Sequence, residues 1–177
     1  MNAGRSRSIG RIAIGIGVIC AINALTIILM YTVAPIFGPL NDVGVGMEGI
    51  AIALLAWMLH PFFGEQARRQ RQLASIAATV GAGLVVVGSI LVISGVTGWF
   101  LASLYTLFGY AVIGCWIVAA NRFVQRSATW PPRLTRSGIA TGVIMMFGLF
   151  VGPASGARVD NEAAAPWYAN VGYAKGA

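Results

Sequence analysis

Arginine is confined to alternate connections between long apolar stretches, and this alternation constrains the fold more than any other feature of the sequence. If the chain crosses a membrane five times, ten of its twelve Lys and Arg residues fall on one side. They form three groups, which are Arg5, Arg7 and Arg11; Arg68, Arg69 and Arg71; and Arg122, Arg126, Arg133 and Arg136. The connections around residues 34–47 and 95–98 contain neither Lys nor Arg. Because basic loops stay in the cytoplasm, the pattern predicts a cytoplasmic N-terminus and an external C-terminus.

The composition is that of a chain with a membrane as its solvent. Hydrophobic residues make up 58% of the 177 residues and charged residues only 10%, whereas a soluble domain has about 25% charged residues. So little polar material cannot cover a water-exposed surface of this size. The net charge of +7 is therefore assigned to arginines that anchor loops near anionic headgroups, and nucleic-acid binding is not predicted.

The sequence predicts an all-α integral membrane protein with five transmembrane helices. The bundle is expected in residues 1–156, followed by an extracytoplasmic tail at residues 157–177. The expected spans are residues 9–33, 43–63, 73–93, 99–120 and 137–153. The first four reach the roughly 20 residues that a helix needs to cross a bilayer, and the fifth approaches that length. The location expected for the protein is the bacterial cytoplasmic (inner) membrane.

The second span is the exception in this pattern. Its uninterrupted apolar part, Gly49–Phe63, is only about 15 residues long, so the helix must begin near Val43 to cross a bilayer. Asn41 or Asp42 is then expected to cap the helix. Glu48 is expected about one turn inside it, near the outer face.

Glu48 is the only carboxylate predicted within an apolar span. A charge inside the membrane is costly, so Glu48 is a candidate protonation site, ion ligand or partner contact, and Asn41 and Asp42 could share a polar pocket with it. The alternative is a structural residue near the interface, where water and the helix dipole reduce the cost. Asn23 is predicted to hydrogen-bond across helices, and Asn121 to cap the fourth helix.

His60 is the only histidine and a candidate ligand for a pigment magnesium or a haem iron. It is better explained as an interfacial residue at a helix end, because a lone histidine carries little information about metals. No metal site is predicted. The residues offer no phosphate-binding loop and no Ser–His–Asp or Cys–His site. We therefore predict no enzymatic activity and no cofactor, and leave open a contact with lipid or pigment.

Small residues recur at four-residue spacing, which lets helix backbones approach closely in membranes. They are Ser75, Thr79 and Gly83 in the third span, and Gly138, Gly142, Gly148 and Gly152 in the fifth. We expect them to pack helices within the chain, with a subunit contact or chance spacing as alternatives. In the tail, Trp167 and Tyr168 are candidates for contact with a partner.

Three loose motifs resemble those of uncharacterised small multi-pass bacterial membrane proteins that are grouped under domains of unknown function. The motifs are Pro35–Glu48, Trp130-Pro131-Pro132-Arg133 and Pro166-Trp167-Tyr168. The resemblance implies no activity. The preferred hypothesis is a non-catalytic integral subunit or accessory protein of a larger membrane complex, which packs against other subunits and lipid through small-residue helix faces. The alternative is a small transporter or permease-like protein with a polar site around Glu48.

Overall fold

The computed structural model describes five segments of the chain, residues 3–34, 36–62, 68–97, 99–127 and 131–150, and their only regular elements are helices. The α-helices are α1 (Ala3–Thr32), α2 (Phe37–Leu59), α3 (Arg68–Ser94), α4 (Trp99–Ser127) and α5 (Pro132–Met146). Two short 3-10 helices, η1 (His60–Phe62) and η3 (Phe147–Phe150), extend α2 and α5. The predicted all-α class is confirmed.

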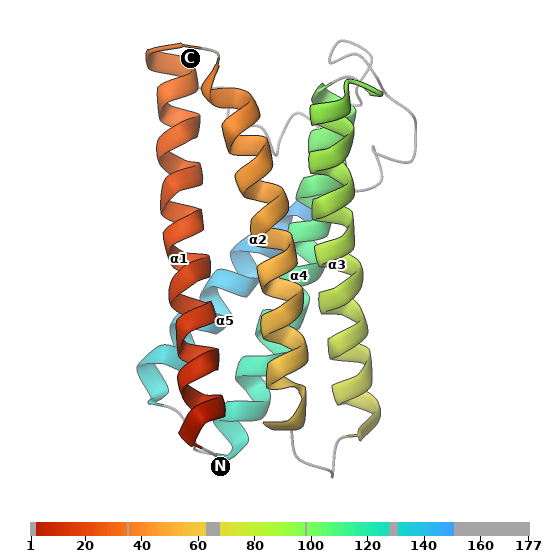
Figure 1. Ribbon diagram of the computed structural model, residues 1–177. Coiled ribbons are helices and arrows are strands. Elements are labelled where there is room, and N and C mark those ends of the chain that lie inside the picture. The colour runs from red at the N-terminus through yellow and green to blue at the C-terminus, as the bar shows by residue number, and fades with distance from the viewer. Residues whose placement is uncertain (1–2, 35, 63–67, 98, 128–130, 151–177) are drawn as a thin grey trace.

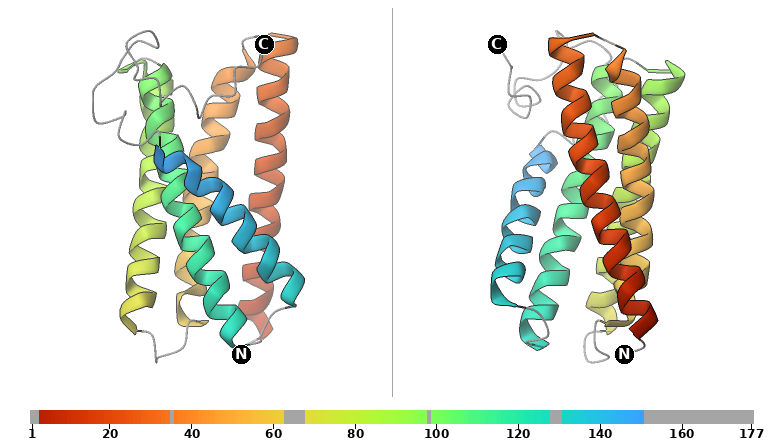
Figure 2. Two further views of the ribbon diagram at one scale, coloured as in Figure 1. Left: turned by 180° about the vertical axis from the view of Figure 1, so that it is seen from behind. Right: turned by 60° about the vertical axis from the view of Figure 1, so that its left-hand side comes forward.

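Consecutive helices alternate in direction, and α1, α2 and α3 form a layer in front of α4 and α5 (Figure 1). Each helix packs mainly on the next one in the sequence, so α4 lies between α3 and α5. α5 runs obliquely across α4 at the back of the bundle (Figure 2). α3 ends before Gly95, whose φ of 65° is the left-handed conformation that commonly terminates a helix.

Four of the helices are long and apolar enough to cross a membrane. The corresponding segments are Arg7–Thr32, Phe37–Leu59, Arg71–Ser94 and Leu101–Gln125. Large apolar side chains on their outer faces, such as Ile28, Trp57 and Ile90, are more than half exposed. Lipid covers such faces, and the helices satisfy their own backbone hydrogen bonds in it. The chain is therefore a multi-pass membrane protein.

The fifth predicted span has a different structure. α5 has 15 residues, or about 22 Å of helix, which is less than the roughly 30 Å hydrocarbon core of a bilayer. Pro132 starts the helix, where its missing N–H leaves no bond unmade. Beyond Met146 the backbone changes to the 3-10 geometry of η3. Within the described residues, α5 is therefore too short to span a bilayer.

α2 begins at Phe37, six residues before the expected start at Val43. The residue before the helix, Ile36, makes no side-chain capping bond, and Asn41 and Asp42 lie inside the helix. The prediction that one of them caps it was wrong, because a proline in the first turn, Pro39, is compatible with a helix. This earlier start moves Glu48 from near one end of the helix to its middle.

Pairs of glycines hold α3, α4 and α5 together. A methyl group on Gly81 of α3 or Gly109 of α4 would lie 2.7 Å from the carbonyl oxygen of the other residue. Gly114 of α4 and Gly142 of α5 repeat the arrangement at 2.6 and 2.7 Å. Such approaches allow the van der Waals packing and backbone contacts that hold helices together in lipid. The side chain of Val85 is fully buried beside the first pair.

The small residues singled out in the sequence fall into two groups. Those on the fifth segment face α4, where added methyl groups would meet Asn121, Gly114 and Leu107; they are Gly138, Gly142 and Gly148. In contrast, Thr79 is exposed and a methyl group at Gly83 would meet no atom within 4 Å. In α3 the close approaches are made by Gly81 and Gly88 instead. Gly152 lies outside the described residues.

Candidate functional site

Glu48 is a buried carboxyl group at the centre of α2, only 8% exposed. Asn23 Nδ2 of α1 donates a hydrogen bond to Glu48 Oε2 at 3.2 Å, which confirms the cross-helix bond predicted for Asn23. The thiol of Cys20 on α1 and the hydroxyl of Tyr110 on α4 also interact with the Glu48 carboxyl group. Three helices therefore direct polar side chains at one carboxyl group.

Residue spacing explains how α1 and α2 form this site. Asn41, Gly44 and Glu48 are three and four residues apart, so they share one face of α2, and this face meets α1. A methyl group at Gly44 would overlap Asn23 Oδ1, an atom that is buried without a hydrogen-bond donor in the described part of the chain. One turn from Asn23, the Thr26 hydroxyl donates to the Asn23 carbonyl at 2.9 Å and lies 3.4 Å from Asn41 Oδ1.

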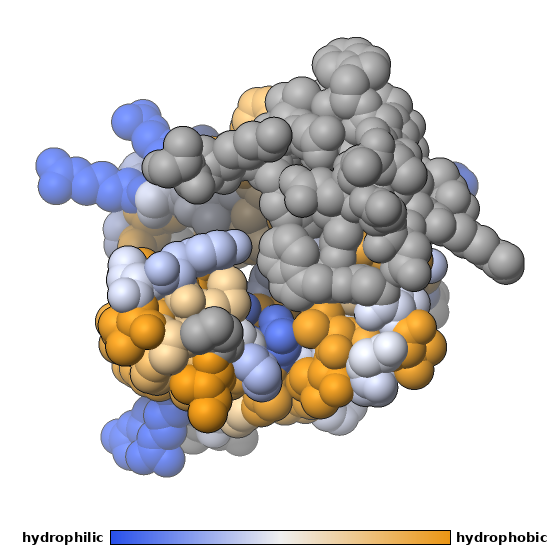
Figure 3. Space-filling view, turned by 90° about the horizontal axis from the view of Figure 1, so that it is seen from above, coloured by the Kyte–Doolittle hydropathy of each residue, from blue (hydrophilic) through white to orange (hydrophobic). Residues whose placement is uncertain are grey.

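Asp42 lies beside this face and contacts a different helix. Its carbonyl accepts a hydrogen bond from Ser89 Oγ of α3, and its carboxylate interacts with Asn41. Asn41 and Asp42 precede Glu48 by seven and six residues, or about 10 Å along the helix. The three predicted site residues thus form two levels of polar groups and not a single pocket. Seen from the end where α2 begins, a hydrophilic spot lies between two apolar areas (Figure 3).

Among the residues that the structure describes, no arginine lies near Glu48. The arginines of the described helices lie toward the opposite end of the bundle, at the starts of α1, α3 and α5 and at the end of α4. On α1, Arg11 is twelve residues from Asn23, or about 18 Å away. An ionised carboxylate that is buried without a cation is costly. The described surroundings of Glu48 therefore supply hydrogen bonds but no countercharge.

His60 is remote from this site and joins two helices. Its Nδ1 lies 2.6 Å from Ser75 Oγ of α3, so Ser75 makes a polar contact where a small-residue packing contact was expected. His60 directly follows α2, twelve residues from Glu48. Across the described segments, no three His, Cys, Asp or Glu residues are grouped closely enough to hold a metal ion.

Asn121 does not cap α4. The helix continues to Ser127, and Asn121 Nδ2 donates to the carbonyl of Ile117 within it at 2.9 Å. The prediction was wrong because Arg122 and Arg126 extend the helix past its apolar part. Arginine is a good helix former, and its long side chain reaches the interface from the last turns of a spanning helix.

Three contributors to the sites were missed in the sequence. Cys20 carries a weak signal, since it lies three residues from Asn23 on the same face of α1. Tyr110 and Ser89 lie in apolar stretches without any distinguishing pattern. Trp167 and Tyr168 lie outside the described residues, so their contact with a partner stays a prediction.

No protein-family model, curated protein or solved structure matches the chain. The resemblance to small bacterial membrane proteins therefore also stays a prediction. What the fold and the site define is a multi-pass membrane protein with a buried carboxyl group in a neutral, hydrogen-bonding setting.

Proposed function

We propose that the protein is a small permease-like membrane protein in which Glu48 binds and releases a proton. The depth of this residue carries the proposal. Glu48 is eleven residues from either end of α2, or about 16 Å from each, and ionisable groups at such depth mark ion pathways and proton relays. Asn23, Cys20 and Tyr110 are neutral neighbours, which suits a carboxyl group that holds a proton.

A series of polar groups supports access to Glu48 from the end where α2 begins. Asp42 and Asn41 lie nearest that end, Thr26 contacts Asn41, and Asn23 contacts Glu48. Each step along the series is within about two helical turns of the next. A proton or a hydrated cation entering at this end would therefore meet hydrogen-bonding groups down to Glu48.

Proton flux into vesicles tests the proposal. The protein is reconstituted in vesicles that enclose a pH-sensitive dye, with potassium and valinomycin to balance charge. Wild-type protein is expected to speed the decay of an imposed pH gradient, and Glu48→Gln to return it to the rate of protein-free vesicles. Asp42→Asn removes the other carboxylate of α2, at the entry of the polar series, and leaves Glu48 in place, so it is expected to slow the decay less than Glu48→Gln does. Equal rates for wild-type protein and Glu48→Gln would contradict the proposal.

We also propose that the chain crosses the bacterial inner membrane five times, with its N-terminus in the cytoplasm. The support is that α5 and η3 run back from the end of the bundle at which the described arginines gather (Figures 1 and 2). In a background lacking Cys20 and Cys115, Asn170→Cys is expected to react with an impermeant maleimide added outside intact cells. Labelling only after lysis would contradict a fifth crossing.

The outward position of Thr79 and Gly83 favours a second candidate function, that of an accessory subunit of a membrane complex. Both residues are small and exposed on α3, so another membrane helix could approach α3 closely there. Gentle detergent extraction from the native membrane should then recover partner proteins, and Gly83→Leu should release them. A monodisperse monomer free of other proteins would exclude this candidate.

A further inference from the structure

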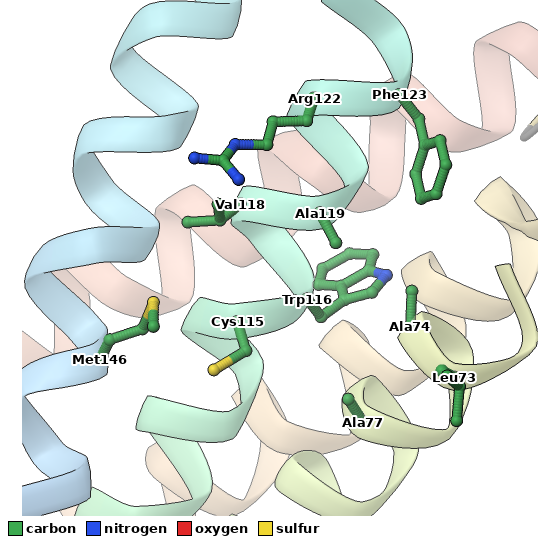
Figure 4. A pocket seen from close by; sticks show the side chains of 10 residues that line it. All are labelled: Leu73, Ala74, Ala77, Cys115, Trp116, Val118, Ala119, Arg122, Phe123 and Met146. Carbon is green, nitrogen blue, oxygen red and sulfur yellow. The ribbon is translucent and has the colours of Figure 1, made fainter. Parts of the chain in front are cut away.

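A second site is formed by a cleft of about 480 Å³ between α3, α4 and α5. This volume is within the roughly 300–1,000 Å³ range of ligand-binding pockets. α4 contributes Cys115, Ala119 and Arg122, while Ala77 of α3 and Met146 of α5 line the two sides (Figure 4). None of the residues that surround Glu48 lines this cleft, so the two sites are separate.

The cleft is charged at one end and apolar along the rest. Arg122 is exposed and extends from α4 toward α5 (Figure 4). Cys115 precedes it by seven residues, or about 10 Å of helix, and Met146 lies level with Gly114. The indole of Trp116 forms part of the wall. Trp116 is 4% exposed, and its buried Nε1 has no acceptor among the residues described.

Charge complementarity indicates what occupies the cleft. The two helices that border it begin with further arginines, Arg69 and Arg71 on α3 and Arg133 and Arg136 on α5. Basic pockets between transmembrane helices, at the level of the headgroups, bind anionic lipids. A second copy of the chain related by two-fold symmetry would instead bring like charges together, which is unfavourable.

We propose that the cleft binds an anionic phospholipid. Arg122 contacts the phosphate, and one acyl chain lies along Ala119 and Cys115 toward Met146. The indole of Trp116 in the wall then lies beside this chain. This site is independent of Glu48, so the proposal stands or fails separately from the proton-binding function.

Quenching of Trp116 fluorescence by brominated lipids tests the proposal. Vesicles of phosphatidylcholine contain either brominated phosphatidylglycerol or brominated phosphatidylcholine, and the signal of Trp116 is the difference between wild-type protein and Trp116→Phe. Brominated phosphatidylglycerol is expected to quench Trp116 at the lower mole fraction. Arg122→Gln is expected to weaken its apparent binding about fivefold. Arg11→Gln, the matched control on α1, should leave binding unchanged.

A second variant separates occupancy of the cleft from charge. Ala119→Phe fills the cleft and keeps every arginine, so it should abolish the quenching of Trp116 by either lipid while circular dichroism remains that of the wild type. Equal quenching by the two lipids in wild-type protein would overturn the proposal. The proposal would also be overturned if Arg122→Gln or Ala119→Phe kept the wild-type preference for phosphatidylglycerol. A dimer that Ala119→Phe dissociates would also overturn it, since a second copy would then be the occupant.

Discussion

The crossing of α3 and α4 at Gly81 leads to a prediction that can be worked out from distances. A methyl group at Gly81 would lie 2.7 Å from the Gly109 carbonyl oxygen and 3.0 Å from the Ile113 nitrogen. An ordinary contact begins near 3.4 Å, so Gly81→Ala must push the backbones apart by roughly 0.7 Å, in the manner of an overpacked core. Both neighbouring atoms belong to a helix backbone and cannot rotate away. Overpacking of this kind costs about 1–3 kcal/mol.

Gly83→Ala is the matched control, because Gly83 lies two residues further along the same helix and faces open space. Both substitutions gain the same helix propensity, about 1 kcal/mol. The difference between the two variants therefore isolates the helix crossing. The free energy of unfolding in mixed micelles with increasing SDS, followed by circular dichroism, should be about 1–3 kcal/mol lower for Gly81→Ala than for Gly83→Ala. Equal stability of the two variants would refute a crossing at Gly81.

Three further predictions concern polar contacts. Gly44→Ala should displace Asn23 from Glu48 and lower the free energy of unfolding by about 1 kcal/mol, and the loss should largely vanish in an Asn23→Ala background; a loss of equal size there would contradict the contact. The single substitutions His60→Ala and Ser75→Ala should each lower the free energy of unfolding by about 1 kcal/mol, and the double variant should lower it by less than the sum of the two. Additive losses in the same unfolding assay would contradict the His60–Ser75 bond. A hydrophobic carbodiimide should modify Glu48 faster at low pH than at high pH, as followed by peptide mass spectrometry, because it reacts with a protonated carboxyl group in an apolar setting. A rate that does not depend on pH would contradict a Glu48 that gains and loses its proton over that pH range.

The long helices could be predicted from the sequence, but not all of their ends. Apolar length and the arginine groups locate α1, α3 and α4, because lipid requires continuous helix. The start of α2 was misplaced since Pro39, Asn41 and Asp42 are typical of loops. In the structure they form the first turns of α2, where Thr26 contacts Asn41 and Ser89 contacts Asp42 from the neighbouring helices. Such contacts override local propensity and cannot be seen in a single segment.

The candidate site was predictable only in part, for a related reason. Glu48 stands out in the sequence as a carboxylate among apolar residues. Its partner Asn23 and its neighbour Tyr110 depend on the depth and rotation of α1 and α4 relative to α2, which a single sequence does not determine. The same holds for Gly81 and Gly83. Both are glycines in one apolar segment, so the sequence alone does not indicate which of them packs against another helix. Helix rotation alone directs the first to α4 and the second outward.

The first helix and the last three helices are held in the bundle by different contacts, and this difference bears on the proposed function. α3, α4 and α5 meet through close glycine crossings, whereas the only buried side chains of α1, among residues 7–32, are the polar Asn23 and Thr26. The buried share of the spanning segments rises accordingly from 11% in α1 to 44% in α4. The polar contacts between α1 and α2 are thus those of the Glu48 site and of Thr26 with Asn41. A change of protonation at Glu48 alters what its oxygens can accept or donate. We therefore expect it to change the attachment of α1 more than the packing of the other helices.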